Sequence, residues 1–463
     1  MEKGFYHDNS PLRGVADDFT NYFNCFRDHF QTKTRHCSRH GARYFKGLVQ
    51  AEKKNMERMA EAVPETDAQA LQNFLSNSPW DPDAVIGHVA ERANDALGKD
   101  KCLLIDETGI PKKGEKSVGV GRQWCGALGK VDNCQVAVFA VLGHSRHAAP
   151  IDCRLFLPKS WVKDRERCKQ AGVPSHRLKY LRKHDLALEM VRTARDRGID
   201  FTWVGCDGFY GEDPDFLREL DQMDEIFMAD VHCDQMIRLE DPQPHVPPRR
   251  SQRGRKPKKL KAQSASIRVD TWVHQQPSSA WQRTRVRDTT KGNLVVDMLH
   301  QRVWLWDGKE ANAHQWHLVV RREVDGNKIK YSLSNAPSDT PLVRLAFQQA
   351  QRYWVERAFQ DAKQQCGLDE YQFRGWRGWH HHMALVLMAM QFMLEQRLQN
   401  QELYPLLSSA DIVSLLKYFL PKRVADQEEV FRQMAIRHKK RQAAIDSAWK
   451  IQSRRLARAY PNS

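Results

Sequence analysis

The chain has 463 residues, of which 41% are hydrophobic and 28% charged. This length and balance are typical of a folded protein with several domains. The 73 Lys and Arg residues against 57 Asp and Glu residues leave a formal net charge of +16, which favours a polyanionic partner such as nucleic acid. The longest apolar run, Met383–Leu394, is too short to cross a bilayer, so we expect a buried helix there and no membrane partner.

The start of the chain predicts where the protein resides. MEKGFYHDNSPLRG contains no apolar segment of the kind found in signal peptides. The ten cysteines are scattered, with no paired spacing, which indicates reduced thiols. We therefore expect a cytoplasmic protein.

Residues 1–96 are predicted to form a compact helical domain. Apolar positions recur every three or four residues, and a turn-forming SNSPWDP interrupts the pattern at 76–82. Such a domain could bind DNA, or it could serve in packing or dimerisation, and the sequence does not separate these alternatives.

Residues 97–231 follow a different pattern, which predicts an α/β core. Three apolar runs, KCLLID, CQVAVFAVLGH and PIDCRLFLP, are typical of strands, and Leu178–Arg197 of a helix. FTWVGCD at 201–207, a helix over DPDFLRELDQM and a strand over 225–230 complete the order. Three strands, a helix, a strand, a helix and a strand indicate one mixed sheet covered by helices.

Residues 232–335 are predicted to be a β-rich insertion that carries a basic arm. Eight of the thirteen residues from Arg249 to Lys261 are Lys or Arg. The candidate DNA-binding residues of this arm are Arg253, Arg255, Lys256 and Lys258. The core is expected to resume over 336–400, and 401–463 is expected to be a basic helical region that is exposed or contacts DNA.

Three motifs resemble known sites without matching them. GIPKKGEKS at 109–117 has one residue too many for a phosphate-binding loop, and GVGRQWCG at 119–126 has its third glycine too late for a dinucleotide site, so a hairpin turn is favoured. The run His380–His382 cannot share one metal ion from a single helix, because consecutive residues point about 100° apart. Polar residues at a helix start, with a phosphate contact as an option, are the favoured interpretation.

Carboxylates that follow apolar runs are the better candidates for chemistry. Asp106 ends LLID, and Asp207 follows WVGC. Two acids on neighbouring strands repel each other unless a cation neutralises them, which points to a shared divalent metal. A turn-capping role remains the alternative for either acid alone, and Asp230, after IFMA, is the rival for the second position.

The helix expected over 351–367 supplies a third acid. At 100° per residue, Arg352, Glu356 and Lys363 lie within about 40° of one another on one face, whereas Asp361 points elsewhere. Spacing alone is equally compatible with a surface ladder of salt bridges.

Together these pieces resemble the DDE transposases, which have a ribonuclease H-like core. Arg352, Glu356 and Lys363 match the Y-x2-R-x3-E-x6-K signature of the insertion-sequence branch, although position 349, where that signature has tyrosine, is Gln. The block IDETGIPKKGEKSVGVGRQWCGALGKVDNCQVAV, together with SPWD and GWRGWHHHMAL, is similar to the insertion sequence 701 family. The likeness covers about residues 20–400.

The resemblance implies a function and a role for each residue. Asp106, Asp207 and Glu356 would bind two Mg²⁺ ions, with Mn²⁺ as a substitute, for cleavage of transposon ends and transfer of their 3′-hydroxyls to target DNA. Arg352 and Lys363 would hold DNA phosphates. Relatives with a β insertion often use a DNA hairpin braced by an aromatic residue. The candidates for that role are Trp272, Trp281, Trp304 and Trp306, for each of which core packing is the alternative.

The resemblance also implies the partners. We expect a homodimer on double-stranded DNA that contacts terminal inverted repeats and target, in a bacterial cytoplasm and at the nucleoid when DNA is bound. Two alternatives remain open from the sequence: a metal-dependent nuclease of the same fold, and a domesticated DNA-binding protein without catalysis.

Overall fold

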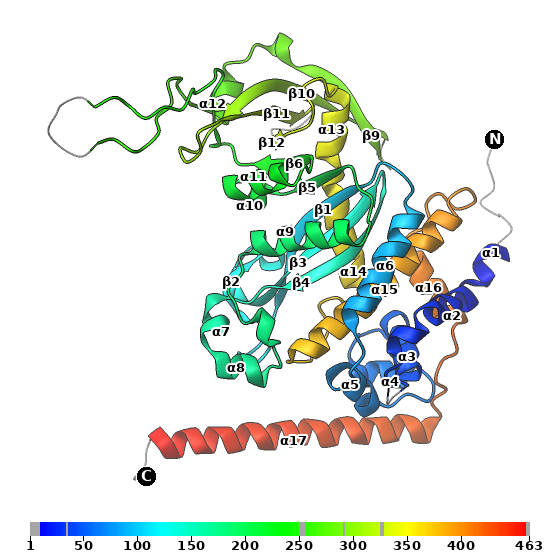
Figure 1. Ribbon diagram of the computed structural model, residues 1–463. Coiled ribbons are helices and arrows are strands. Elements are labelled where there is room, and N and C mark those ends of the chain that lie inside the picture. The colour runs from blue at the N-terminus through cyan, green and yellow to red at the C-terminus, as the bar shows by residue number, and fades with distance from the viewer. Residues whose placement is uncertain (1–9, 34–35, 250–255, 290–291, 325–327, 460–463) are drawn as a thin grey trace.

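The computed structural model describes residues 10–33, 36–249, 256–289, 292–324 and 328–459 (Figure 1). A large mixed sheet forms the centre, with helices on both of its faces. The N-terminal helices pack beside α15 (Trp376–Gln399), and a long C-terminal helix runs along the edge of the molecule. The expected α/β class, with helical regions at both ends of the chain, is confirmed.

The N-terminal region is helical as predicted. Its elements are α1 (Ser10–Arg13), α2 (Val15–Cys25), η1 (Arg27–Phe30), α3 (Ser38–Gln50), α4 (Met56–Ala62), α5 (Ala68–Ser76) and α6 (Pro82–Ala96). Asn55, Asp67 and Asp81 cap α4, α5 and α6 by accepting hydrogen bonds from backbone N–H groups of the first turn. The SNSPWDP segment thus ends one helix and starts the next.

The central sheet begins with six strands. They are β1 (Cys102–Pro111), β2 (Gly121–Cys125), β3 (Lys130–His144), β4 (His147–Leu155), β5 (Trp203–Cys206) and β6 (Phe227–Val231). β3 is antiparallel to β1, β2 and β4, whereas β1, β5 and β6 run parallel as neighbours. β2 and β3 form a hairpin. The GVGRQWCG stretch, predicted as a hairpin turn, instead contains strand β2, and the turn follows at Gly126–Leu128.

Helices cover the two faces of this sheet. On one face lie α9 (Lys183–Asp196) and α11 (Pro214–Gln222), with α7 (Lys159–Lys163), α8 (Arg165–Gln170) and α10 (Gly208–Gly211) in the connections. On the other lie α14 (Tyr353–Cys366) and α15, preceded by α13 (Leu342–Gln351). Side chains of β1 alternate between these faces: Leu103 and Ile105 enter the core under α9, while Leu104 enters the core under α14 and α15. Asp106 therefore lies on the α14 face.

The β-rich segment continues the central sheet. Its elements are β7 (Met236–Ile237), β8 (Ile267–Arg268), α12 (Val269–His274), β9 (Gln282–Thr289), β10 (Gly292–Leu305), β11 (His314–Glu323) and β12 (Ile329–Ser334). β12 pairs with β6, where Ser332 lies opposite Asp230, and β11, β10 and β9 follow outward. Because β6 is otherwise an edge strand, this pairing satisfies its free backbone groups. The segment expected as an insertion thus shares the sheet of the core.

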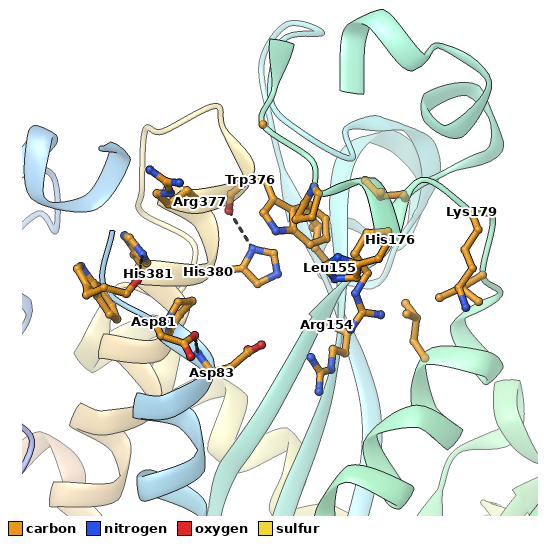
Figure 2. Close-up of a pocket in the computed structure, with 18 of the residues that line it drawn as sticks. Asp81, Asp83, Arg154, Leu155, His176, Lys179, Trp376, Arg377, His380 and His381 are labelled. Carbon is orange, nitrogen blue, oxygen red and sulfur yellow. Dashed lines mark hydrogen bonds between the residues drawn. The ribbon is translucent and has the colours of Figure 1, made fainter. Parts of the chain in front are cut away.

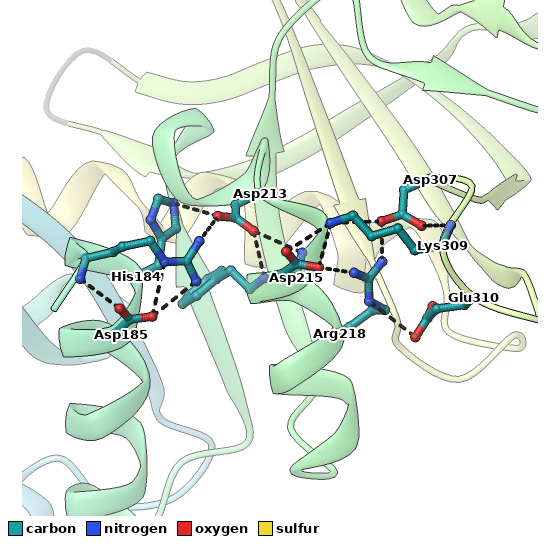
Figure 3. A network of polar contacts seen from close by, with 10 residues as sticks. His184, Asp185, Asp213, Asp215, Arg218, Asp307, Lys309 and Glu310 are labelled. Carbon is teal, nitrogen blue, oxygen red and sulfur yellow. Dashed lines mark hydrogen bonds and ion pairs between the residues drawn. The ribbon is translucent and has the colours of Figure 1, made fainter. Parts of the chain in front are cut away.

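Charged side chains also tie this segment to the core helices (Figure 3). The guanidinium of Arg218 on α11 contacts Asp215 and lies 2.9 Å from Asp307, in the β10–β11 connection. Lys309, in the same connection, lies 3.1 Å from Asp215. The network holds the β10–β11 connection on the α11 side of the sheet.

The C-terminal region consists of α16 (Ser409–Phe419) and α17 (Gln427–Ala459). α17 contacts α4 through two ion pairs, Arg437 with Glu61 at 2.9 Å and Lys440 with Glu57 at 2.8 Å. Most of its other side chains are exposed, as predicted for the basic tail. Arg253 and Arg255 of the predicted arm lie outside the described residues, and Lys256 and Lys258 are exposed.

The apolar run Met383–Leu394 lies within α15 and is buried in the core, as predicted. Among the helices that the structure describes, none combines the length and the apolar character needed to cross a bilayer.

Gly211 gives a test of how the β5–β6 edge is held. A Cβ at this position would overlap the carbonyl oxygen of Asp230, whereas one at Gly126 would meet open space. Gly211→Ala should therefore lower the free energy of unfolding by about 1–3 kcal/mol, measured by urea denaturation. The control Gly126→Ala should leave it nearly unchanged, and equal stability of the two variants would contradict the packing described.

Candidate active site

Three acids meet at one edge of the sheet because three parallel strands are in register. Ile105 of β1 pairs with Cys206 of β5, and Cys206 pairs with Ala229 of β6. The residues that come next in these three segments are Asp106, Asp207 and Asp230. The three acids therefore follow one another across the sheet. With strands about 4.8 Å apart, Asp207 is the nearer partner of Asp106, and Asp230 lies one strand further away. β1 continues to Pro111, so Asp106 lies within its strand and not at its end.

Arg352, at the junction of α13 and α14, contacts this row of acids. Its guanidinium lies 3.3 Å from Asp106, 3.1 Å from Asp230 and 2.8 Å from Glu356. Burial acts to lower the pKa of Arg352, but Asp230, Asp106 and Glu356 outweigh it, and the pKa is raised. One cation thus joins three carboxylates from three separate segments of the chain.

The charged forms of Asp106 and Asp207 are disfavoured in the folded chain. Burial, together with the negative charge of Asp207, raises the pKa of Asp106 from 3.8 to about 7. Burial also raises the pKa of Asp207, and Arg352 opposes the rise. The side chain of Asp207 accepts a hydrogen bond from the Phe209 N–H at 3.1 Å and so caps α10. The turn-cap alternative is therefore present, and it coexists with the position beside Asp106.

The late helix differs in one detail from the expected segment. It consists of two helices, with Arg352 at their junction and Glu356 in the first turn of α14. The predicted Arg352–Glu356 salt bridge is present, and the side chain of Glu356 is 58% exposed. Asp361 points away into the core, where it accepts a hydrogen bond from Ser409. Lys363 is half-buried and makes no ion pair with any residue described here.

Gln349, at the signature position of tyrosine, has a structural partner. Its side-chain amide is buried and donates to Ser332 Oγ at 2.9 Å, and Ser332 Oγ donates to Asp230 at 2.7 Å. A chain of hydrogen bonds thus runs from α13 through β12 to the acid on β6. Asp230, the rival for the second acid position, is engaged by both Ser332 and Arg352.

Sequence reasoning missed two cations near the acids. Arg321 on β11 and Lys330 on β12 lie opposite each other in the sheet, and both are half-buried. Burial lowers the pKa of Lys330, and Asp230 acts against this change. The alternation of side chains along β11 and β12 would have placed Arg321 and Lys330 near the acids only if those strands had been assigned to the core sheet.

Away from the acid edge, a group of metal-type ligands lies in the connections after β5 and β6. Glu212, His232 and Asp234 are exposed, and their ligand atoms lie within 4.8 Å of one another. It is the one such group of three among the residues with described positions. Glu212 also contacts the ring of His232 directly, so an ion pair already engages two of its three members.

The four candidate tryptophans have different surroundings. Trp272 is buried, and Trp281 lies under the guanidinium of Arg322 at 4.2 Å. Trp304 and Trp306 line a cavity of about 650 Å³ that Glu212 and Asp234 also line. Core packing therefore accounts for Trp272.

Two of the three consecutive histidines, His381 and His382, join the N-terminal region to the core, whereas His380 bonds the carbonyl of Trp376 on its own helix (Figure 2). The ring nitrogens of His381 lie 2.7 Å from the Leu75 carbonyl oxygen and 3.0 Å from that of Trp80. His382 accepts from the Tyr44 hydroxyl at 2.8 Å. Burial lowers the pKa of His380 and of His381 to about 4, which keeps both rings neutral. The SPWD and GWRGWHHH motifs thus form one interface and line one cavity of about 400 Å³.

The donor set at the acid edge fits divalent metal ions. Asp106, Asp207 and Glu356 offer carboxylate oxygens, which Mg²⁺ prefers. Burial raises the pKa of both Asp106 and Asp207, and the negative charge of Asp207 adds to the rise at Asp106, so their ionised forms are disfavoured without a further cation. A bound cation would supply that charge directly.

Comparison with known proteins identifies the family. The model of a family described as DDE superfamily endonuclease matches residues 25–293. The probable transposase for insertion sequence element IS701 from Microchaete diplosiphon is 26% identical over 327 residues, covering 69% of this chain and 72% of that protein. Endonucleases of this type generally use divalent metal ions. The matched family segment includes Asp106 and Asp207 and ends before Glu356.

Metal binding should stabilise the folded chain through the acid edge. At a Mg²⁺ concentration about 100 times Kd, we expect a gain of about 2.7 kcal/mol, measured by thermal unfolding. Asp106→Asn should abolish the gain, whereas the exposed control Asp95→Asn should keep it. An equal Mg²⁺ response in both variants would place the metal elsewhere.

The pH dependence of stability without metal has a defined sign. Between the ordinary pKa of 3.8 and the raised value of about 7, Asp106 keeps its proton in the folded chain and loses it in the unfolded chain. The folded state then binds more protons, so stability must fall as pH rises through this window. Urea denaturation in EDTA should show this slope, and Asp106→Asn should flatten it. An unchanged slope in the variant would contradict the burial described for Asp106.

Proposed function

The chain belongs to the DDE superfamily of endonucleases, and we propose that it is a DNA transposase. In this proposal it cleaves transposon ends and joins their 3′-hydroxyls to target DNA by two-metal-ion phosphoryl transfer. The observation that carries the proposal is the alignment of Asp106 with Asp207 on neighbouring parallel strands, joined to Glu356 through Arg352.

Asp106, Asp207 and Glu356 would hold two Mg²⁺ ions, or Mn²⁺ in their place. Such a pair of ions stabilises the attacking and leaving oxygens of an in-line displacement at phosphorus. Asp106 is held by the sheet and Asp207 by its cap on α10, whereas Glu356 is exposed and would approach the ions once DNA is present. The site would therefore be completed from α14.

Arg352 would act as a positioning residue in two states. Without metal, its guanidinium neutralises Asp106, Asp230 and Glu356 and keeps them together. With the acids bound to metal, the same guanidinium would be available to a DNA phosphate, which it can bind with two parallel hydrogen bonds. Lys363, on the same face of α14, would hold a further phosphate.

Binding to DNA would involve several basic regions. The arm with Arg253, Arg255, Lys256 and Lys258 and helix α17 carry a large part of the excess positive charge, and the N-terminal helices would add further contacts. Contacts of these residues with phosphates would make affinity strongly dependent on salt. A transposon has two ends, so we propose that two copies of the chain act together on terminal inverted repeats and target DNA.

Transposition is favoured over simple cleavage by one comparison. The relative from Microchaete diplosiphon is named a probable transposase, and it aligns over most of both chains. Nuclease activity without joining and DNA binding without catalysis remain as distinguishable outcomes of the experiment below.

The test combines purified full-length protein, the DNA ends that flank its gene, target plasmid and Mg²⁺. We expect cleavage at the ends and joined products, resolved by sequencing gels. Asp106→Asn and Glu356→Gln should each lower both steps by more than about a hundredfold, because each removes a ligand needed in the transition state. The surface controls Asp95→Asn and Glu91→Gln should retain activity.

Each contrary result has a distinct meaning. Wild-type cleavage that never leads to joining would support a nuclease. Specific binding without cleavage would support a non-catalytic DNA-binding protein. Normal activity of Asp106→Asn would contradict the assigned site, and loss of activity in Asp230→Asn but not in Asp207→Asn would assign the second position to Asp230.

A further inference from the structure

We propose that a cavity on the far flank of α14 binds the phosphodiester backbone of a DNA strand that leaves the acid edge. The cavity has a volume of about 630 Å³ and lies between α14, α15, the β3–β4 turn, β9 and residues 404–409. We call it the α14 cavity. The choice of DNA as the ligand rests on the proposed function, whereas the features of the cavity described below do not depend on it.

Positive charge in the α14 cavity is not balanced. Four arginines line it, each from a different element: Arg146, Arg287, Arg357 and Arg397. Asp361 is the single carboxylate among the lining residues. It is already engaged by Ser409 at 2.9 Å and by Arg357 at 3.2 Å. The guanidinium groups of the other three arginines therefore have no carboxylate partner among the residues that line the cavity.

Arg397 shows the imbalance most clearly. It is half-buried, its Nε is buried without a hydrogen-bond partner, and it forms no ion pair within the described ranges of the chain. Burial lowers its pKa; Asp361 opposes this, and Arg146 and Arg357 add to it. A guanidinium stays charged in proteins, so an unpaired one in a partly buried cavity needs an anion.

Aromatic groups complete the surface for a nucleic acid. Arg287 lies over the rings of Tyr353 at 4.5 Å and Trp354 at 5.0 Å. The Nε1 of Trp354 and the Nε of Arg287 are both buried without a hydrogen-bond acceptor. These two buried donors add to the unsatisfied polar groups around the cavity. Tyr353 is 48% exposed, and its ring offers a stacking face to a base.

The α14 cavity is continuous with the acid edge over the surface of one helix. On α14, Tyr353 lies about 60° and Arg357 about 100° around the axis from Glu356. Both are exposed, and both also line the cavity. A strand held at Glu356 would therefore cross these two side chains before it reaches Arg397. This continuity favours a DNA backbone over a free nucleotide, which shares the same phosphate chemistry.

Binding of DNA without catalysis tests the proposal. The probes are a fluorescein-labelled single strand and a duplex of random sequence, and anisotropy is measured in EDTA over a series of KCl concentrations. Arg397→Gln and Arg146→Gln should each weaken binding about tenfold, as expected for a lost hydrogen bond to a charged group. Each should also reduce the slope of log K against log salt by about 1.

Arg192→Gln is the matched control. Arg192 lies on α9, on the other face of the sheet, and pairs with Glu219 on the surface, so its loss removes equal charge away from the cavity. Its DNA affinity and salt slope should match those of the wild type. Arg397→Lys, which keeps the charge, should recover part of the affinity, and Arg146 lies in an exposed turn, so its variant is informative even if Arg397→Gln is unstable.

Two results would overturn the inference. One is equal DNA binding by Arg146→Gln, Arg397→Gln and Arg192→Gln. In the other, the two cavity variants lose binding to deoxyadenosine monophosphate or inorganic phosphate, but their DNA binding is unchanged. That result would indicate a free-nucleotide site. Repeating the assay in an Asp106→Asn background separates this inference from the proposed function. A wild-type chain that never cleaves DNA refutes that function, yet a persistent Arg397 effect still supports the cavity.

Discussion

The central constraint on this molecule is the placement of like charges at one buried sheet edge. The parallel register of β1, β5 and β6 sets Asp106, Asp207 and Asp230 in a row, and burial opposes the ionisation of Asp106 and Asp207. Such a row is tolerable only next to a cation. Arg352 supplies that cation, and its position at the junction of α13 and α14 brings Glu356 to the same place. The placement of Glu356 beside the sheet acids thus depends on one set of charges.

The extension of the sheet serves the same edge. β12 pairs with β6, which places Ser332 opposite Asp230 and allows Gln349 to reach it from α13. The ion pairs around Arg218 hold the β10–β11 connection on α11. Residues far apart in the chain therefore fix the orientation of Asp230, while Asp207 is fixed locally by its cap on α10. This difference gives the two acids different freedom to bind an ion.

Much of the fold and part of the site could be predicted from local patterns. Apolar runs identified β1, β3, β4, β5 and β6, and helical periodicity placed Arg352 and Glu356 on one face. Pairing across the sheet could not be predicted, because strand order depends on contacts between distant segments. For that reason β9–β12 were expected as an insertion, and Arg321 and Lys330 were not associated with the acids. The burial of His381 and His382 against the N-terminal region was also not visible in a single stretch of sequence.

The central claim is that Asp106, Asp207 and Glu356 bind the divalent ions. Anomalous diffraction from crystals of the full chain with a DNA end and Mn²⁺ tests it most directly. The account predicts anomalous peaks between the carboxylates of Asp106 and Asp207, with Glu356 as a ligand. Peaks confined to the exposed group of Glu212, His232 and Asp234, with Arg352 still bound to Asp106, would contradict it.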